Sequence, residues 1–438
     1  MKRSMNKISP CGLGRSYKGL LLATFLPIAA TSTLGNEPAD GPEADSRPNI
    51  IFILFDDLNA PAAEDGGYDP APTPTFDRLA ESGVNFTNAH SNAPLCAPSR
   101  PSLLTGLHPV TTNYYGGTDN AQARLWRENP RLRRAVTLMS HFRNHGYFVC
   151  GTGKVFHNYH EDPFVWQDEN GYSQFGYLPS WGPYPWDGVE RGYTRPPDVA
   201  DHDAVPFLPG MMGYAPLSEV PNVPPAADGS SPGYEGWRLY NRPFHYAGPE
   251  DRDLLPDELN ARWAVEKLEG GLPASRPFLM VVGMNRPHFP QYTPDEYFDA
   301  VPLENVRLPE DPGAGLEEAP PVMGEWPLVG HTSGSRRHFN AIMANGGREE
   351  LRRMKRAYLA SVAFVDDQMG KILAALDNSP YAENTIVVVT SDHGFHLGSK
   401  QFVGKFTLWE ESTRVPFIFA GPGIAEGVAV DAAVSLVD

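Results

Sequence analysis

The chain has 438 residues, of which 41% are hydrophobic, and it contains 44 prolines and 42 glycines. This length and apolar content suffice for one large α/β domain with a sizeable core, and the many prolines and glycines predict extensive loops. The formal net charge of -17 argues against nucleic acid or an anionic membrane as the main partner.

The N-terminal segment has the pattern of a secretory signal peptide. Basic residues precede an apolar run over 19–30, and small residues follow. The run contains Pro27 and is short for a bilayer crossing, which favours export over a membrane anchor. We therefore expect a signal peptide over 1–35, a linker over 36–46, and a periplasmic or secreted protein with no membrane contact after signal removal.

Three cysteines occur, at positions 11, 96 and 150. Signal removal would take away Cys11, and two remaining cysteines do not make a disulfide framework, which fits a bacterial periplasm. Cys150 lies within an apolar run, so we expect it to be a buried strand residue.

Five apolar runs bounded by turn residues predict buried strands. They are nearly continuous rather than alternating, as in a mostly parallel sheet that is covered on both faces. The runs occupy 49–55, 147–150, 278–284, 385–390 and 416–420. Amphipathic patterns between them predict helices over 75–82, 135–145, 256–269 and 349–376. We expect an α/β domain over 47–438, with a mostly parallel central sheet sandwiched by helices.

Two stretches, 158–249 and 307–345, lack these patterns and are rich in proline and glycine. We expect long loops there, because irregular segments of this length in compact domains are often functional. The first stretch also holds several tryptophans and tyrosines. These side chains could stack on sugar rings, or they could cover the sheet edges and pack locally; the sequence leaves both open.

Acidic side chains follow the first and fourth predicted strands. Asp56 and Asp57 end the first run, and Asp392 and His393 come just after the fourth. Ligand sites in open α/β sheets form beyond the carboxyl ends of the strands, so we expect these groups to meet. Three carboxylates and one histidine favour a hard divalent cation, Ca²⁺ or Mg²⁺.

Basic side chains follow the other runs. Lys154 and His157 come after the second run, and His288 comes after the third. Lys405 lies 12 residues beyond His393. Each alone would fit a solvated lysine or a satisfied histidine, but their positions after strands place them beside the carboxylates.

Cys96 begins the run C-A-P-S-R, which is followed by L-T-G. The prolines after it suit the first turn of a helix, which would place Cys96 at a helix N-terminus. Unpaired N–H groups and the helix dipole favour an anion at such a position. Arg100 adds a planar cation that matches the oxygens of a sulfate group.

These motifs together resemble the formylglycine-dependent sulfatases of the alkaline phosphatase-like superfamily and, within that family, iduronate-2-sulfatase most. The segments that carry the resemblance are R-P-N-I-I-F-I-L-F-D-D, C-A-P-S-R-P-S-L-L-T-G, G-K-V-F-H, R-P-H-F-P and S-D-H-G-F-H-L-G. The resemblance implies that a formylglycine-generating enzyme converts Cys96 to formylglycine (3-oxoalanine). Its hydrate would be the nucleophile, and its second hydroxyl would allow sulfate to leave.

The resemblance also implies a role for each polar residue of the site. The ligands of one Ca²⁺, which we favour over Mg²⁺, would be Asp56, Asp57, Asp392, His393 and an oxygen of modified Cys96. Arg100 would orient the hydrate, and Lys154 and Lys405 would bind sulfate oxygens. His288 would protonate the leaving sugar oxygen, and His157 would assist the second hydroxyl.

The implied activity is removal of O-sulfate from a sulfated oligosaccharide by an exo-acting, iduronate-2-sulfatase-like enzyme. A phosphoester or phosphonate monoester hydrolase of the same superfamily, and an inactive form that only binds the glycan, are the alternatives. The segment that leads to Lys405, L-G-S-K-Q-F-V-G-K, departs from the iduronate-2-sulfatase pattern, which leaves the sugar open. We find no match to the family's smaller C-terminal subdomain and expect a chain truncated before it.

Overall fold

The computed structural model describes residues 47–61, 67–115, 126–157, 166, 172–173, 183–185, 213–219, 222–223, 234–239, 242–316 and 331–438. The predicted signal peptide, the predicted linker and most of the predicted loop over 158–249 lie outside these residues. None of the helices in the described ranges combines the length and the apolar character that a bilayer crossing needs.

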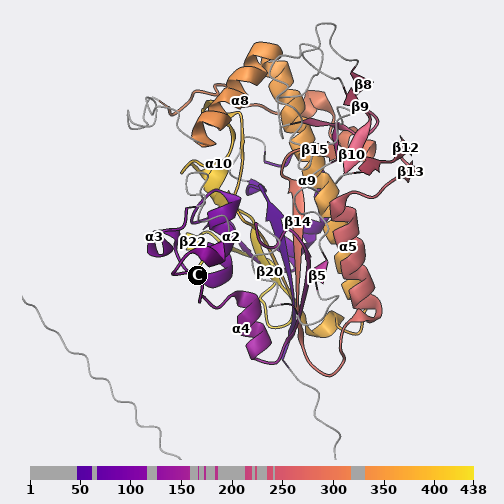
Figure 1. Ribbon diagram of the computed structural model, residues 1–438, viewed down its shortest axis with the longest axis vertical. Coiled ribbons are helices and arrows are strands. Elements are labelled where there is room, and N and C mark those ends of the chain that lie inside the picture. The colour runs from indigo at the N-terminus through magenta and orange to yellow at the C-terminus, as the bar shows by residue number, and fades with distance from the viewer. Residues whose placement is uncertain are drawn as a thin grey trace, which may run out of the picture. The chain divides into compact units, whose positions relative to one another are not determined.

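An eight-stranded sheet forms the centre of the described chain (Figure 1), in the order β21-β2-β20-β16-β1-β14-β4-β5. Its strands are β1 (Asn49–Asp56), β2 (Gly83–Phe86), β4 (Phe148–Gly153), β5 (Tyr172–Ser173), β14 (Phe278–Pro287), β16 (Thr385–Ser391), β20 (Phe417–Ala420) and β21 (Val428–Val430). Strand β1 runs parallel to β14 and β16, and β4 runs parallel to β14. Strand β20 is antiparallel to β16 and β2. The predicted α/β fold with a mostly parallel sheet is confirmed, and all five apolar runs form strands.

Helices cover both faces of this sheet. On one side lie α1 (Pro74–Glu81), α5 (Pro256–Glu266) and α9 (Gly347–Asp377), and on the other lie α2 (Cys96–Thr105) and α4 (Leu138–Asn144). Alternate residues of β14 enter two separate apolar clusters: Met280 packs with the α5 and α9 side, and Leu279 packs with the α2 and α4 side. Because both faces are buried, the strand sequences are continuously apolar rather than alternating.

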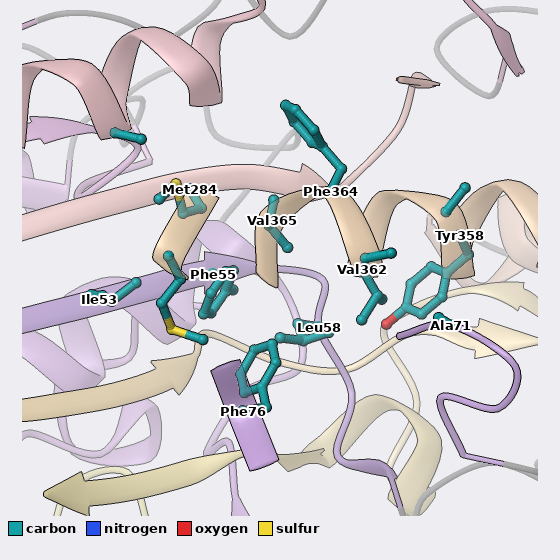
Figure 2. Close-up of a cluster of buried hydrophobic side chains, with 14 of the residues drawn as sticks. Ile53, Phe55, Leu58, Ala71, Phe76, Met284, Tyr358, Val362, Phe364 and Val365 are labelled. Atoms are coloured by element: carbon teal, nitrogen blue, oxygen red, sulfur yellow. The ribbon is translucent and has the colours of Figure 1, made fainter. Parts of the chain in front are cut away.

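Helix α9 supplies much of the larger cluster. Figure 2 shows Tyr358, Val362 and Val365 of α9 directed toward Phe55 and Phe76, which come from β1 and α1. These α9 side chains recur at spacings of three and four, so they form one stripe of the helix. Full burial of such a side chain contributes about 1.5–3 kcal/mol, which fixes α9 against the end of β1.

The remaining elements lie outside the central sheet and the five helices named above. The helices are α3 (Pro109–Thr112), α6 (Asp295–Asp299), α8 (His331–Asn345) and α10 (Glu410–Thr413), and α5 continues into a π-helical turn over Lys267–Gly271. The strands outside the central sheet are β3 (Ala89–His90), β6 (Tyr184–Pro185), β7 (Tyr214–Pro216), β8 (Asn222–Val223), β9 (Tyr234–Glu235), β10 (Trp237–Leu239), β11 (Arg242–Phe244), β12 (Tyr246–Gly248), β13 (Asp251–Arg252), β15 (Gln291–Thr293), β17 (His396–Leu397), β18 (Val403–Gly404), β19 (Arg414–Val415) and β22 (Val434–Ser435).

The predicted loop over 307–345 is wrong in its last part, because α8 occupies His331–Asn345. This helix carries a glycine and several weak helix formers, so its sequence gives little local signal. Phe339 and Ile342 are buried in the cluster that α9 lines, and this packing stabilises the helix. In the other predicted loop, Trp166 packs on Phe156 with ring centroids 6.3 Å apart, which supports local packing for that aromatic residue.

Candidate active site

Five polar side chains lie just beyond the carboxyl ends of the parallel strands. Asp56 is the last residue of β1, Asp57 comes directly after it, and Asp392 follows β16. Lys154 follows β4, and His288 follows β14. All five are buried. Parallel neighbours end at the same edge of a sheet, so the topology brings together groups that are far apart in the sequence.

Cys96 reaches the same place from the N-terminus of α2. The residue before it, Leu95, is extended, and the helix ends at Gly106, whose φ of 67° is left-handed. The side chain of Cys96 is buried, with 2% of the residue exposed. Its Sγ lies 3.3 Å from Asp56 Oδ1, 3.2 Å from His393 Nε2 and 3.0 Å from Lys405 Nζ.

These neighbours make residue 96 a favourable position for negative charge. Burial raises the pKa of the Cys96 thiol, but the charges of Lys154, Lys405 and His393 and a hydrogen bond with His157 lower it more. The pKa of the thiol is therefore well below its ordinary value. An anionic oxygen at the same position would be stabilised by the same groups.

Buried ion pairs connect the carboxylates to three permanent cations. Arg100 Nε lies 2.8 Å from Asp392 Oδ2, and Arg100 Nη2 lies 3.4 Å from Asp56 Oδ1. Lys154 also contacts Asp56, and Lys405 Nζ lies 2.5 Å from Asp57 Oδ1. Removing one partner of such a pair leaves an uncompensated buried charge, at a cost of about 3–5 kcal/mol.

The protonation of these groups follows from their surroundings. Burial and the negative charge of Cys96 raise the pKa of Asp56, but Lys154, His288 and Arg100 lower it more, so Asp56 is ionised. Lys405 is the most accessible of the three cations, with 17% of its side chain exposed. Burial lowers the pKa of Lys405, but the nearby carboxylates raise it above its ordinary value, so it keeps its charge.

The acidic side chains form a group that fits a divalent cation. Ligand atoms lie within 4.8 Å of one another in two sets, Asp56, Cys96, Asp392 and His393, and Asp57, Cys96 and His288. Nδ1 of His393 lies 3.0 Å from the carbonyl oxygen of Gly394, so it can donate there while Nε2 faces the group. This is how proteins orient a metal-ligating histidine. Burial raises the pKa of Asp392 to about 7, although the positive charge of Arg100 lowers it. The negative charge of this carboxylate is therefore not fully compensated, and a bound cation would stabilise it further. The donor set suits Ca²⁺ or Mg²⁺.

Two further histidines border the group. Nε2 of His288 lies 3.9 Å from Asp57 Oδ2, and its Nδ1 lies 2.5 Å from the carbonyl oxygen of Phe289. His157 is half-buried, and among the described residues its Nδ1 has no hydrogen-bond partner. Both imidazoles therefore lie close to the group around residue 96.

The sequence profile of the Sulfatase family matches residues 48–438. The chain belongs to the sulfatase family. It is 35% identical to a sulfatase of Formosa agariphila over 398 residues, which are 89% of this chain and 67% of that protein. It is 29% identical to the iduronate 2-sulfatase of Mus musculus over 92% of this chain and 64% of that protein. The chain thus spans about two thirds of the length of these relatives.

The solved structure of a phosphonate monoester hydrolase of Agrobacterium radiobacter has the same fold. It matches with a TM-score of 0.57 and 20% identity, over 90% of this chain and 72% of that one. At this level of identity the match speaks for the architecture alone, because related enzymes on one fold can act on different esters.

The structure of this sulfatase family member also shows a residue that the sequence did not reveal as part of the site. The hydroxyl of Tyr358 lies 2.9 Å from both the carbonyl oxygen of Asp57 and Asn59 Oδ1, either of which can accept its proton, and it accepts the N–H of Asn59 at 3.1 Å. Asp57 has a φ of 68°, a left-handed conformation that is costly for a residue other than glycine. In the sequence, Tyr358 is one position of an apolar helix stripe, and nothing distinguishes it from a core residue.

Proposed function

We propose that this chain hydrolyses the O-sulfate ester of a sulfated glycan, in an exo-acting reaction like that of iduronate-2-sulfatase. The main support is the position of Cys96 at the N-terminus of α2, with Lys405 Nζ and His393 Nε2 at 3.0 and 3.2 Å from its sulfur. The cations and carboxylates around residue 96 largely balance one another, so a bound divalent cation would give the site local positive charge on a chain whose net charge is -17.

We propose further that a formylglycine-generating enzyme converts Cys96 to formylglycine. The Sγ of Cys96 then stands where an oxygen of the aldehyde hydrate would lie. The hydrate supplies a nucleophilic hydroxyl and a second hydroxyl through which sulfate can depart. Arg100 pairs with Asp392 and Asp56, and so orders the groups that surround residue 96 and orient the hydrate.

The side chains around residue 96 have two kinds of role: the lysines bind the sulfate group and the histidines transfer protons. Lys154 and Lys405 each exchange a carboxylate contact for the oxygens of the sulfate group, where their charge offsets the charge of the transition state. His288 protonates the leaving sugar oxygen, because an alkoxide is a poor leaving group. His157 accepts the proton of the second hydroxyl, because its hydrogen bond to residue 96 places its imidazole next to that group.

We propose that Asp56, Asp57, Asp392 and His393 hold one Ca²⁺, which would supply Lewis acidity at the ester; Mg²⁺ is the alternative ion. This assignment rests on the ligand set described above and on the orientation of His393 by Gly394. Calcium binding to the Asp56→Ala variant tests this assignment. This variant should no longer bind calcium, whereas a variant at the distant Asp377 should bind it as the wild type does.

The proposed activity is tested by sulfate release from a panel of sulfated disaccharides that includes 2-O-sulfated uronates and algal sugars. The protein is produced together with a formylglycine-generating enzyme. The Cys96→Ala variant should release no sulfate, and the Cys150→Ala variant, which changes the other buried cysteine, should remain active. Release by Cys96→Ala at the wild-type rate would refute the role of residue 96.

A phosphonate or phosphate monoester is the substrate class that must be compared with sulfate, because the Agrobacterium radiobacter hydrolase shares the fold. Matched aryl sulfate, phosphate and phosphonate esters give this comparison directly. A higher kcat/KM for sulfate supports the proposal, and a higher value for either phosphorus ester would reassign the chain to that class.

We also propose that residues 1–35 direct export to the periplasm or the medium, on the basis of their basic and apolar pattern. The N-terminal sequence of the protein recovered from its host should then begin after this segment. Recovery of the intact N-terminus from the cytoplasm would refute export.

A further inference from the structure

A buried carboxylate outside the site holds the strand end that carries His288. Asp257 is the second residue of α5, and 2% of it is exposed. Its Oδ1 accepts hydrogen bonds from the backbone N–H of Asn285 at 2.8 Å and from the Asn285 side chain at 2.9 Å. Its Oδ2 accepts the backbone N–H of Arg286 at 2.9 Å, and Asn260 adds a longer contact of 3.3 Å to Oδ1.

These backbone groups need a partner because β14 leaves the regular sheet ladder at this point. Its pairing with β1 is regular as far as Leu54 and Gly283, and then the register shifts so that Asp56 lies opposite Pro287. Such an irregularity frees N–H groups that the ladder would otherwise use. Figure 1 shows α5 alongside β14, and the start of α5 supplies the missing acceptor through Asp257.

The anchored segment leads directly to His288. The backbone N–H of His288 donates to the carbonyl of Asn285 at 3.0 Å, which closes a tight turn. The side chain of Gln291 donates to the carbonyl of Pro287 at 3.0 Å and holds the far side of the same turn. The imidazole then faces Asp57, with Nε2 at 3.9 Å from its Oδ2. Only Pro287 therefore lies between Arg286, whose backbone N–H Asp257 holds, and His288, whose imidazole faces the site.

We propose that Asp257 is a positioning residue for His288: its carboxylate fixes the turn from which the imidazole reaches the leaving oxygen. This inference rests on the proposed function, in which His288 protonates that oxygen. Asp257 faces the backbone of β14 and contributes no atom to the group around Cys96.

A test follows from the chemistry of the leaving group. Protonation of the leaving oxygen is needed for a sugar alkoxide but hardly for 4-nitrophenolate, which leaves readily as an anion. A misplaced His288 should therefore lower kcat for a sulfated disaccharide by roughly 10- to 100-fold while kcat for 4-nitrophenyl sulfate changes by less than about 3-fold. KM should change little for either ester, because the sulfate group is bound by the two lysines.

Asp257→Asn is the main variant, since its amide is of similar size but its NH₂ group cannot accept the N–H of Arg286. His288→Gln should show the same dependence on the leaving group. The double variant that carries both substitutions should be no slower than His288→Gln alone on the disaccharide, because both substitutions remove the same function, protonation of the leaving oxygen.

Asp366→Asn is the matched control. Asp366 is also buried, and its carboxylate accepts the backbone N–H groups of Thr75 and Phe76 at 3.0 and 2.9 Å at the start of α1. Its loss should lower the thermal midpoint as the loss of Asp257 does, but the ratio of the two kcat values should stay that of the wild type.

An equal loss of kcat on both esters in Asp257→Asn, or additive effects in the double variant, would overturn the inference and leave Asp257 a stability residue only. If Asp257→Asn does not fold, Asn285→Ala removes only the side-chain contact to Asp257 and should shift the kcat ratio in the same direction by a smaller factor. An unchanged ratio in Asn285→Ala would then overturn it. Failure of the wild type to release sulfate from either ester would instead overturn the proposed function, and this inference with it.

Discussion

Tyr358→Phe should weaken both the fold and the proposed cation site. The hydroxyl of Tyr358 is the link between helix α9 and the end of β1, through the carbonyl of Asp57 at 2.9 Å and the N–H of Asn59 at 3.1 Å. Asp57 has a φ of 68°, which costs an ordinary residue about 1–2 kcal/mol. The hydroxyl helps to hold Asp57 in this conformation, in which its carboxylate faces the site.

The size of the effect can be worked out from these contacts. Phenylalanine keeps the ring that packs against the core, so the substitution opens no large cavity. It leaves a buried carbonyl and a buried N–H without this partner, and each unsatisfied group costs about 1–3 kcal/mol. We expect the free energy of unfolding to fall by about 2–4 kcal/mol, allowing for some local relaxation. If Asp57 relaxes from its left-handed conformation, cation binding must restore up to about 1 kcal/mol of strain, because aspartate tolerates this conformation better than most residues, and the affinity falls up to about 5-fold.

Urea unfolding and calorimetric titration of the metal-free protein with CaCl₂ measure the two quantities. Tyr381→Phe is the control, because its hydroxyl makes one peripheral hydrogen bond, to the carbonyl of Leu272 at 3.3 Å. This control should cost less than about 1 kcal/mol and leave calcium binding unchanged. Wild-type calcium affinity in Tyr358→Phe would refute the reasoning that this hydroxyl holds Asp57 in place for the cation.

Three other predictions concern single residues. Burial lowers the pKa of His396 from 6.5 to about 3, although a hydrogen bond to Ser399 raises it. Between these two values the unfolded state binds more protons than the folded state, so the free energy of unfolding falls as the pH falls below 6.5. The slope reaches about 1.4 kcal/mol per pH unit, and His396→Asn should flatten it in urea unfolding followed from pH 6.5 to 4; an equally steep curve would contradict this. Gly153→Ala should abolish soluble expression or activity, because Gly153 has a φ of 71° and an added Cβ would lie 2.7 Å from Asn260 Nδ2; a wild-type thermal midpoint would be the contrary result. Cys150→Ala should cost about 1 kcal/mol in urea unfolding and leave sulfate release unchanged, whereas loss of release would show that the buried thiol has a further role.

The sequence was informative where one local pattern has one structural outcome. The run over 49–55 is apolar after Asn49, and a central strand covered on both faces buries nearly all side chains of such a segment. The stripe over 349–376 repeats at three and four residues, which only a helix can align on one face. The rule that the ends of parallel strands meet at one edge of a sheet predicts that Asp56, Asp392 and Lys154 lie near one another.

Local pattern was not enough where a structure depends on a distant partner. The sequence of α8 contains weak helix formers and predicts a loop. The segment is helical because Phe339 and Ile342 are buried in the apolar cluster to which α9 also contributes. Strand order likewise depends on which long-range pairing buries the most apolar surface, a quantity that no short window contains.

Local patterns in the chain therefore specify the α/β class, the buried strands and the types of charged residue at the strand ends. Which residues hold those charged groups in place depends on how distant segments pack. Tyr358 and Asp57 are 301 positions apart, and Asp257 and Arg286 are 29 apart on different elements. Their hydrogen bonds exist because packing of α9 and α5 brings a hydroxyl and a carboxylate to backbone groups that the sheet leaves unpaired. A buried polar group must find a partner, and only the folded chain determines which partner is within reach.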